Sequence, residues 1–217
     1  WGLMKGKLIV IEGPDGSGKS TQIDIMRKYL EDKGFDVVET REPGGTKIGE
    51  KIRDIILDTE NTEMDPVCEA LLYAASRAQH VSEVIKPEIE KGKIVICTRY
   101  IYSSLVYQGI GRGLGVDMVS AINTAAIQGM MPDLTLLFDI DPVVGIKRKI
   151  SDGKADRLEL EDIKFHKKVY NGYKEIASLY KDIKVIDASR SIDEIQKSVL
   201  EIIDKTLDIG SKNYRGR

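Results

Sequence analysis

A glycine-rich segment near the start of the chain places the strongest constraint on its fold. The segment IVIEGPDGSGKST (residues 9–21) runs from an apolar stretch into the spacing G-x-x-x-x-G-K-S. In this motif, glycines let backbone N–H groups converge on phosphate oxygens at the N-terminus of a helix. We therefore predict a phosphate-binding loop that consists of Gly13, Pro14, Asp15, Gly16, Ser17, Gly18, Lys19, Ser20 and Thr21.

Two residues of this loop have chemically defined roles. Lys19 is expected to bridge the β- and γ-phosphates of a nucleoside triphosphate, and Ser20 is expected to hold Mg²⁺. The alternative is a glycine turn that binds no ligand, but the strand before the loop and the helix after it argue against that alternative. ATP and Mg²⁺ are therefore the expected donor and metal.

Short apolar runs alternate with helical patterns along the chain. We predict buried strands at residues 8–12, 36–40, 94–98, 134–140 and 184–188. We predict helices at residues 20–33, 46–57, 66–85 and 192–206. The alternation implies right-handed βαβ crossovers and an α/β fold with a parallel sheet covered by helices on both faces. Ligands of such sheets bind beyond the carboxyl ends of the strands.

Length and composition limit the organisation and the partners. The 217 residues, 41% of them hydrophobic, fit one domain, which we expect over residues 4–209 with a disordered tail at 210–217. With 33 basic and 35 acidic residues the net charge is −2, so no nucleic-acid partner is expected. The absence of a long apolar run and of a cysteine framework indicates a cytoplasmic protein without a membrane span.

Two further segments are expected to be flexible. KRKISDGKADR (residues 147–157) is cationic and poor in apolar anchors. GIGRGLG (residues 109–115) has the wrong spacing for a dinucleotide-binding motif and follows no strand, so we interpret it as a flexible loop.

Four other segments carry a resemblance to a known family. They are TREPGGT (40–46), LLYAASRAQHV (71–81), TRYIYSSLVYQGIGRG (98–113) and DRLELEDIKFHKKVYNGY (156–173). Together with EGPDGSGKST they resemble the motifs of thymidylate kinases, in the expected order and over almost the whole chain. The resemblance implies a nucleoside-monophosphate-kinase fold with five parallel strands, ATP with Mg²⁺ as donor, dTMP as acceptor and dTDP as product. It also implies a mobile lid at about 147–158 and a homodimer.

The acceptor site combines residue chemistry with this resemblance. Tyr73 and Arg77 are four residues apart on one helix face, so a ring can stack on a base while a guanidinium reaches its carbonyl. By resemblance the base is thymine. Arg99 follows an apolar strand and would grip the dTMP phosphate, with Arg53 as a second contact. The other matching positions are Asp15, Pro43, Ser104, Tyr107, Gln108 and Glu159.

Ordinary structural roles remain the alternatives for several of these residues. Tyr73 and Arg77 could form a surface cation–π pair, Arg53 could be solvated, and Glu159 could lie on a solvated helix start. Ser104, Tyr107 and Gln108 taken singly could be packing residues.

Catalysis of this kind needs cations but no essential general base, because an acceptor phosphate oxygen is already ionised at pH 7. The expected catalytic residues include Asp15, Lys19 and Arg99. One subgroup of the family has an arginine inside the loop, where this chain has Gly16 and Ser17, so the transition-state cation must come from elsewhere. The candidates in the lid region are Arg148, Lys154 and Arg157.

Thr98 departs from the family pattern, which has Asp before the arginine of the DRY or DRH motif. That Asp helps to organise Mg²⁺ and its waters, so Thr98 removes a charge and is expected to lower activity. Glu12, Asp15 and Asp139 are candidates for compensation. Two alternatives stay open: a kinase of another nucleoside monophosphate, or a catalytically weak nucleotide-binding homologue. A GTPase-type switch is disfavoured because no Asn-Lys-x-Asp motif is present.

Overall fold

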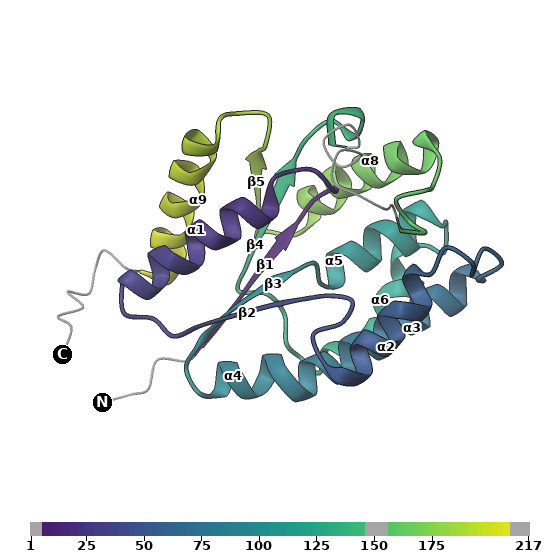
Figure 1. The fold of residues 1–217 in the computed structure, drawn as a ribbon, viewed down its shortest axis with the longest axis horizontal. Coiled ribbons are helices and arrows are strands. Elements are labelled where there is room, and N and C mark those ends of the chain that lie inside the picture. The colour runs from purple at the N-terminus through teal and green to yellow at the C-terminus, as the bar shows by residue number, and fades with distance from the viewer. Residues whose placement is uncertain (1–5, 146–155, 209–217) are drawn as a thin grey trace.

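A five-stranded parallel sheet forms the centre of the computed structural model, which describes residues 6–145 and 156–208. The strand order is β2-β3-β1-β4-β5, and every neighbouring pair is parallel (Figure 1). The strands are β1 (Lys7–Glu12), β2 (Val37–Arg41), β3 (Ile94–Thr98), β4 (Leu134–Asp139) and β5 (Ile183–Asp187). The predicted α/β class and all five predicted strands are confirmed, with boundaries that differ by one residue at most.

Helices connect the strands and cover the sheet. The α-helices that lie wholly within the described residues are α1 (Lys19–Asp32), α2 (Lys47–Leu57), α3 (Pro66–His80), α4 (Lys86–Glu90), α5 (Ile101–Ser104), α6 (Val116–Ile127), α8 (Ile163–Leu179) and α9 (Ile192–Leu207). Two segments are π-helical: η1 (Val81–Ile85) continues α3, and η2 (Leu105–Gly111) continues α5. The predicted helix at 66–85 is therefore α3 together with η1. Its start has the expected signal, because the Asp65 side chain accepts hydrogen bonds from the first backbone N–H groups and proline follows it.

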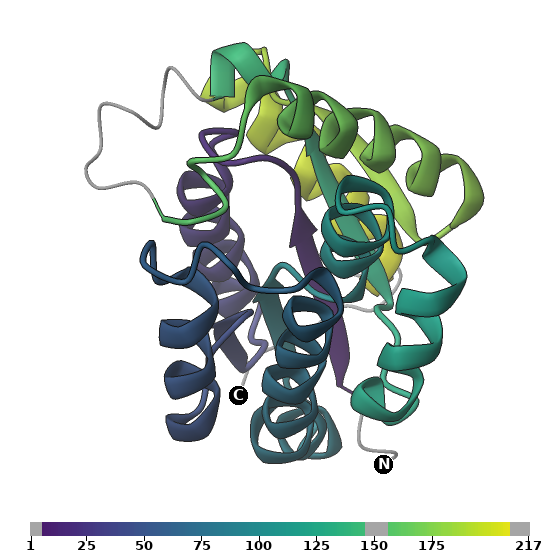
Figure 2. The same ribbon diagram turned by 90° about the vertical axis from the view of Figure 1, so that its right-hand side faces the viewer.

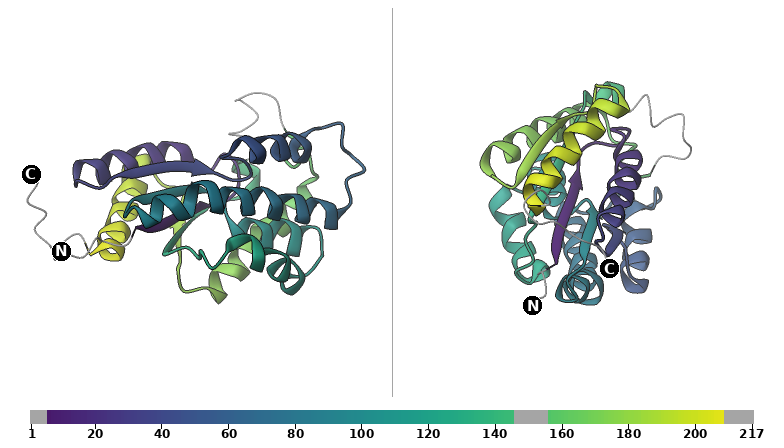
Figure 3. Two further views of the ribbon diagram at one scale, coloured as in Figure 1. Left: turned by 90° about the horizontal axis from the view of Figure 1, so that it is seen from below. Right: turned by 90° about the vertical axis from the view of Figure 1, so that its left-hand side faces the viewer.

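Two apolar cores lie on opposite faces of the sheet. On β1, Ile9 and Ile11 pack with α1 and α9, whereas Leu8 and Val10 pack with the core that includes α8 and the η1 and η2 segments. Successive side chains of a strand point to opposite faces, so a strand that is apolar throughout is buried on both sides. Figure 2 shows helices around the central strand β1, and Figure 3 shows α1 and α9 side by side.

The prediction of a flexible loop at 109–115 is wrong for its first half. Gly109 and Gly111 are buried in η2, and the turn is confined to 112–115. A Cβ on Gly111 would lie 2.9 Å from the Phe165 ring on α8, so glycine lets the η2 backbone approach that helix. The glycines thus serve close packing here.

Three sequence predictions fall wholly or partly outside the described ranges. These are the flexible segment at 147–157, most of the lid at 147–158, and the tail at 210–217. Within residues 6–145 and 156–208, no helix is long and apolar enough to cross a membrane.

Candidate active site

The glycine-rich loop connects β1 to α1 and curls around the ammonium of Lys19. Nζ of Lys19 donates hydrogen bonds to the carbonyl oxygens of Gly13 at 3.0 Å and Pro14 at 2.7 Å. Gly13 has φ +130°, and a Cβ there would lie 2.5 Å from the Phe138 carbonyl oxygen, so only glycine fits against β4. Gly18, with φ +83°, precedes the first turn of α1. Both the loop shape and the helix start therefore depend on glycines.

A cavity opens over this loop and is called here the loop cavity. Its lining comes from the loop and the start of α1, from the carboxyl ends of β2 and β3, and from α2: Asp15, Gly16, Ser17, Gly18, Lys19, Ser20, Thr21, Arg41, Glu42, Arg53, Thr98 and Arg99. Burial and the nearby Arg41 lower the pKa of Arg53. Neighbouring cations of this kind favour an anionic ligand.

A second cavity, of about 180 Å³, adjoins the first and is called the inner cavity. Its lining is Asp15, Glu42, Pro43, Arg53, Leu57, Tyr73, Arg77, Arg99, Ser103, Tyr107, Gln108, Asp156, Leu158 and Glu159. Four residues line both cavities: Asp15, Glu42, Arg53 and Arg99. A molecule in the inner cavity can therefore meet one on the loop at these four side chains.

Arg99 lies at this junction and is held on several sides. Nη2 lies 3.0 Å from both carboxylate oxygens of Asp15, and Nη1 donates to Ser103 Oγ at 3.3 Å and to Tyr173 OH at 3.2 Å. Its guanidinium carbon lies 5.1 Å from the centroid of the Tyr107 ring. Burial acts to lower the pKa of Arg99, but Asp15, Tyr107, Tyr173 and Glu12 together outweigh it, and the pKa lies well above its usual range. The cation is thus permanent and oriented.

Glu12 stabilises the position of Arg99 indirectly, through two hydroxyl groups. Its Oε2 accepts hydrogen bonds from Ser103 Oγ at 2.6 Å and Tyr173 OH at 2.9 Å, the two hydroxyls that contact Arg99. Its Oε1 accepts from the backbone N–H groups of Tyr100 and Ser103, both at 3.0 Å. Glu12 is 1% exposed, so its carboxylate is fully used in structural contacts.

The structure separates the three carboxylates that were expected to compensate for Thr98. Glu12 is engaged as described, and Asp139 lines a different cavity, next to Tyr170 and Lys174. Asp15 alone of the three lines the loop cavity together with Thr98.

Tyr73 and Arg77 both line the inner cavity, as their spacing on α3 predicts. The alternative of a surface cation–π pair between them is wrong, because Arg77 is 1% exposed and its guanidinium lies 5.2 Å from the centroid of Tyr100 instead. Nε of Arg77 donates to Glu42 at 2.7 Å, and Nη1 donates to Ser104 at 3.1 Å and to Asn123. The guanidinium is therefore fixed in orientation at the cavity wall.

Most other residues predicted for the acceptor site line the same cavity. These are Asp15, Pro43, Arg53, Arg99, Tyr107, Gln108 and Glu159. Ser104 is not among the described lining residues, and it contacts Arg77 from behind, whereas its neighbour Ser103 reaches the cavity. Sequence reasoning missed Glu42 and Asp156, although both lie inside motifs that had been recognised.

Arg157 lies in a buried ion cluster. Its Nη2 lies 2.6 Å from Oε2 of Glu69, and its Nε donates to the Ile56 carbonyl oxygen at 2.8 Å. Glu69 also accepts from Gln108 and Arg112. Arg157 is not among the described residues that line either cavity, which places it away from the loop. The other two expected lid cations, Arg148 and Lys154, fall outside the described residues.

Comparison with known proteins agrees with this geometry. The chain matches the thymidylate kinase family over residues 11–199. It is 54% identical over 197 residues to a thymidylate kinase of Finegoldia magna, covering 91% of this chain and 97% of the relative. It is 52% identical over 195 residues to one of a Geobacillus species (88% and 93% covered), and 50% identical over 198 residues to one of Clostridium novyi (90% and 97% covered). With a matching fold, phosphate loop and acceptor-side motifs, the chain belongs to the thymidylate kinase family.

Proposed function

We propose that this protein transfers the γ-phosphoryl group of ATP to dTMP, giving dTDP and ADP. The observation that carries the proposal is the junction of the two cavities at Asp15 and Arg99. A donor on the glycine-rich loop and an acceptor in the inner cavity would there bring their phosphates together. Such proximity supplies much of the rate enhancement in phosphoryl transfer.

The inner cavity suits a pyrimidine nucleotide. Tyr73 offers a ring face for the base, and Arg77 offers a fixed guanidinium for a base carbonyl. Arg53 and Arg99, which line both cavities, would bind the acceptor phosphate. Tyr107 contacts the guanidinium of Arg99 and would border the sugar, where it would disfavour a ribose 2′-OH.

The donor side suits a nucleoside triphosphate with Mg²⁺. Asp15, Ser20 and Thr98 give the loop cavity oxygen donors, the type that Mg²⁺ prefers when it keeps several waters and binds phosphates. Ser20 would hold the ion, which supplies charge neutralisation at the β- and γ-phosphate oxygens. Lys19 would release the Gly13 and Pro14 carbonyls and bridge the same phosphates.

The side chains act by positioning and by neutralising charge. The acceptor oxygen is already ionised, so no residue has to remove a proton from it. Arg99 would exchange part of its contact with Asp15 for the acceptor phosphate, which leaves Asp15 to contact the sugar hydroxyl or the waters of the metal. Arg148 and Lys154 would be the cations that stabilise the transition state. Arg157 would act with them only if its ion pair with Glu69 broke.

Two finer features belong to this proposal. Thr98 places a hydroxyl where the family has a carboxylate, so turnover should be lower than with Asp at this position. A homodimer is expected, and Leu71 on α3 and Met118 on α6 are exposed apolar side chains on two helices that pack together.

The test is an assay of purified protein with ATP, Mg²⁺ and dTMP that follows ADP release and identifies dTDP chromatographically. We expect ADP and dTDP in equal amounts, and loss of both products with excess EDTA. ADP release that does not depend on dTMP would contradict the proposal. Binding of both nucleotides without turnover would identify a catalytically weak nucleotide-binding homologue instead.

A further inference from the structure

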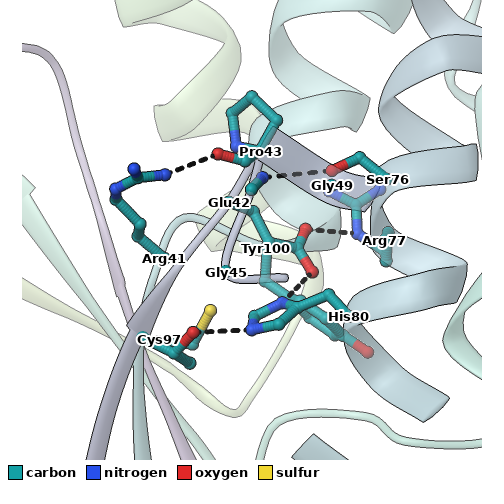
Figure 4. Close-up of polar contacts among 12 residues, drawn as sticks. Arg41, Glu42, Pro43, Gly45, Gly49, Ser76, Arg77, His80, Cys97 and Tyr100 are labelled. Atoms are coloured by element: carbon teal, nitrogen blue, oxygen red, sulfur yellow. Dashed lines mark hydrogen bonds and ion pairs between the residues drawn. The ribbon is translucent and has the colours of Figure 1, made fainter. Parts of the chain in front are cut away.

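A buried chain of polar contacts lies behind the inner cavity and ends on Arg77. His80 Nε2 lies 2.6 Å from Thr40 Oγ1, and His80 Nδ1 lies 3.1 Å from Glu42 Oε1. The other oxygen of Glu42 accepts from Arg77 Nε at 2.7 Å. Figure 4 shows Glu42 between His80 and Arg77, with a dashed line to each. The side chains of all three are 2% exposed or less.

The contacts assign the direction of the hydrogen bond between His80 and Glu42. An ionised carboxylate only accepts hydrogen bonds, so Nδ1 of His80, which faces Glu42, is the donor. Nε2 faces the Thr40 hydroxyl, a group that can donate or accept. Each group has a matched partner, so the carboxylate of Glu42 is held by two donors from opposite sides.

Arg77 gains a fixed orientation from this arrangement. Its guanidinium is a planar fork, and contacts to Glu42, Ser104 and Asn123 use Nε and Nη1. Among the described residues, Nη2 is the guanidinium nitrogen without such a contact, and Arg77 lines the inner cavity. A rotation of the Glu42 carboxylate would therefore turn the guanidinium of Arg77, including the edge that would donate to a base carbonyl.

We propose that His80 is a positioning residue for the acceptor base: it orients Glu42, and Glu42 orients Arg77. The proposal rests on the proposed function, because it assigns the inner cavity to dTMP. His80 is not among the described residues that line the inner cavity, so it acts on the ligand only through Glu42. Thr40 contacts the other ring nitrogen of His80 and thereby completes the chain.

The same region could in principle hold a metal, because Glu42, His80 and Cys97 bring one possible ligand atom each within 4.8 Å of one another. The contacts argue against that use. Both ring nitrogens of His80 have partners, and the cation of Arg77 contacts Glu42. Burial raises the pKa of the Cys97 thiol well above its usual range, so it stays protonated and donates to the Arg99 carbonyl oxygen.

Two amide substitutions at His80 separate positioning from general packing. In His80→Asn the side-chain amide can take the place of Nδ1 and donate to Glu42. In His80→Gln the longer side chain places its amide near Nε2, so the contact with Thr40 is kept and the donor to Glu42 is lost. We expect His80→Gln to raise the KM for dTMP about 10-fold, as for an acceptor left without its donor. We expect His80→Asn to stay near wild type, and the KM for ATP to be unchanged in both.

Two outcomes would overturn the proposal while leaving the proposed function intact, provided that the wild type is active. The first is that both variants have the same KM for dTMP. The second is that the KM values for dTMP and ATP rise in parallel. If either variant fails to fold, as judged by thermal melting, His80→Ala serves as the second test. It lacks the donor to Glu42 and should raise the KM for dTMP alone, and an unchanged KM would overturn the proposal. A wild type that neither binds nor converts dTMP would instead contradict the proposed function, and the role of His80 with it.

Discussion

Nη2 of Arg99 lies 3.0 Å from each carboxylate oxygen of Asp15, and this contact forms the boundary between the loop cavity and the inner cavity. An acceptor phosphate that binds Arg99 must share the guanidinium with this carboxylate. The pair therefore holds the cation in place, and under the proposed function it would set the position at which the two phosphates meet.

The first prediction concerns this carboxylate. Asp15→Asn keeps the size of the side chain but removes its charge. We expect kcat to fall about 100-fold, comparable to the loss of one preorganised catalytic group. The KM for dTMP should not rise, because Arg99 loses a competing anion. Steady-state kinetics with both substrates varied will measure this, and an unchanged kcat would show that Asp15 only holds Arg99.

The second prediction concerns recognition of the base. Arg77→Lys keeps the charge beside the buried Glu42 but replaces the planar fork with a point charge. We expect the KM for dTMP to rise about 10-fold or more, equivalent to about 1.4 kcal/mol, with the KM for ATP nearly unchanged. Arg27→Lys is the control, because Arg27 pairs with Glu31 on the solvent-facing side of α1. An equal rise in the KM values for dTMP and ATP would show that Arg77 is not part of the acceptor site.

The third prediction restores the carboxylate that the family has at the end of β3. Thr98→Asp should raise kcat about 10-fold, equivalent to about 1.4 kcal/mol, or lower the Mg²⁺ requirement, with little change in dTMP affinity. Thr98→Asn is the matched control, because it has nearly the same shape without the charge. Kinetics across an Mg²⁺ titration will distinguish them. The account of Thr98 fails if Asp and Asn behave alike.

The fourth prediction concerns stability and pH. Burial alone would raise the pKa of Glu69, but hydrogen bonds from Arg112, Gln108 and Arg157 lower it below its ordinary value. A carboxyl with a lowered pKa in the folded state stabilises the fold above its unfolded pKa of about 4.3, and this stabilisation is lost as the pH falls through the folded value.

Glu69→Gln should therefore cost about 3 kcal/mol at pH 7, because it leaves buried Arg157 without its anion. The difference from wild type should shrink in strongly acidic solution, where Glu69 is protonated. Urea unfolding at pH 7 and at decreasing pH below 4 will measure both effects, with exposed Glu31→Gln as the control. A constant difference across that range would mean that the charge of Glu69 is not what stabilises the fold.

Local sequence patterns correctly predicted the strands and the glycine-rich loop. The apolar run at 94–98 became β3, and the glycine spacing at 13–18 became the loop around Lys19, because the signal for each lies in a short run of adjacent residues. Helix α6 was missed because Gly115 precedes it without a side-chain cap, so the usual start signal is absent.

Contacts across long stretches of sequence could not be predicted in the same way. Glu42 and His80 are 38 residues apart, and they meet only because the end of β2 lies beside the end of α3. Arg157 was expected near the phosphates, but Glu69 lies 88 residues away in sequence and pairs with it in the fold. The choice between Ser103 and Ser104 also depends on distant contacts, because Ser103 donates to Glu12 and Ser104 accepts from Arg77.

The most direct test of the central claim is a comparison of acceptors at saturating ATP and Mg²⁺. The specificity constant kcat/KM would be measured for dTMP, dUMP, UMP, AMP and CMP with the same preparation. The account predicts the highest value for dTMP, because it assigns Tyr73 and Arg77, which line the inner cavity, to the base, and Tyr107 to the sugar. A clearly higher value for any of the other four monophosphates would contradict it.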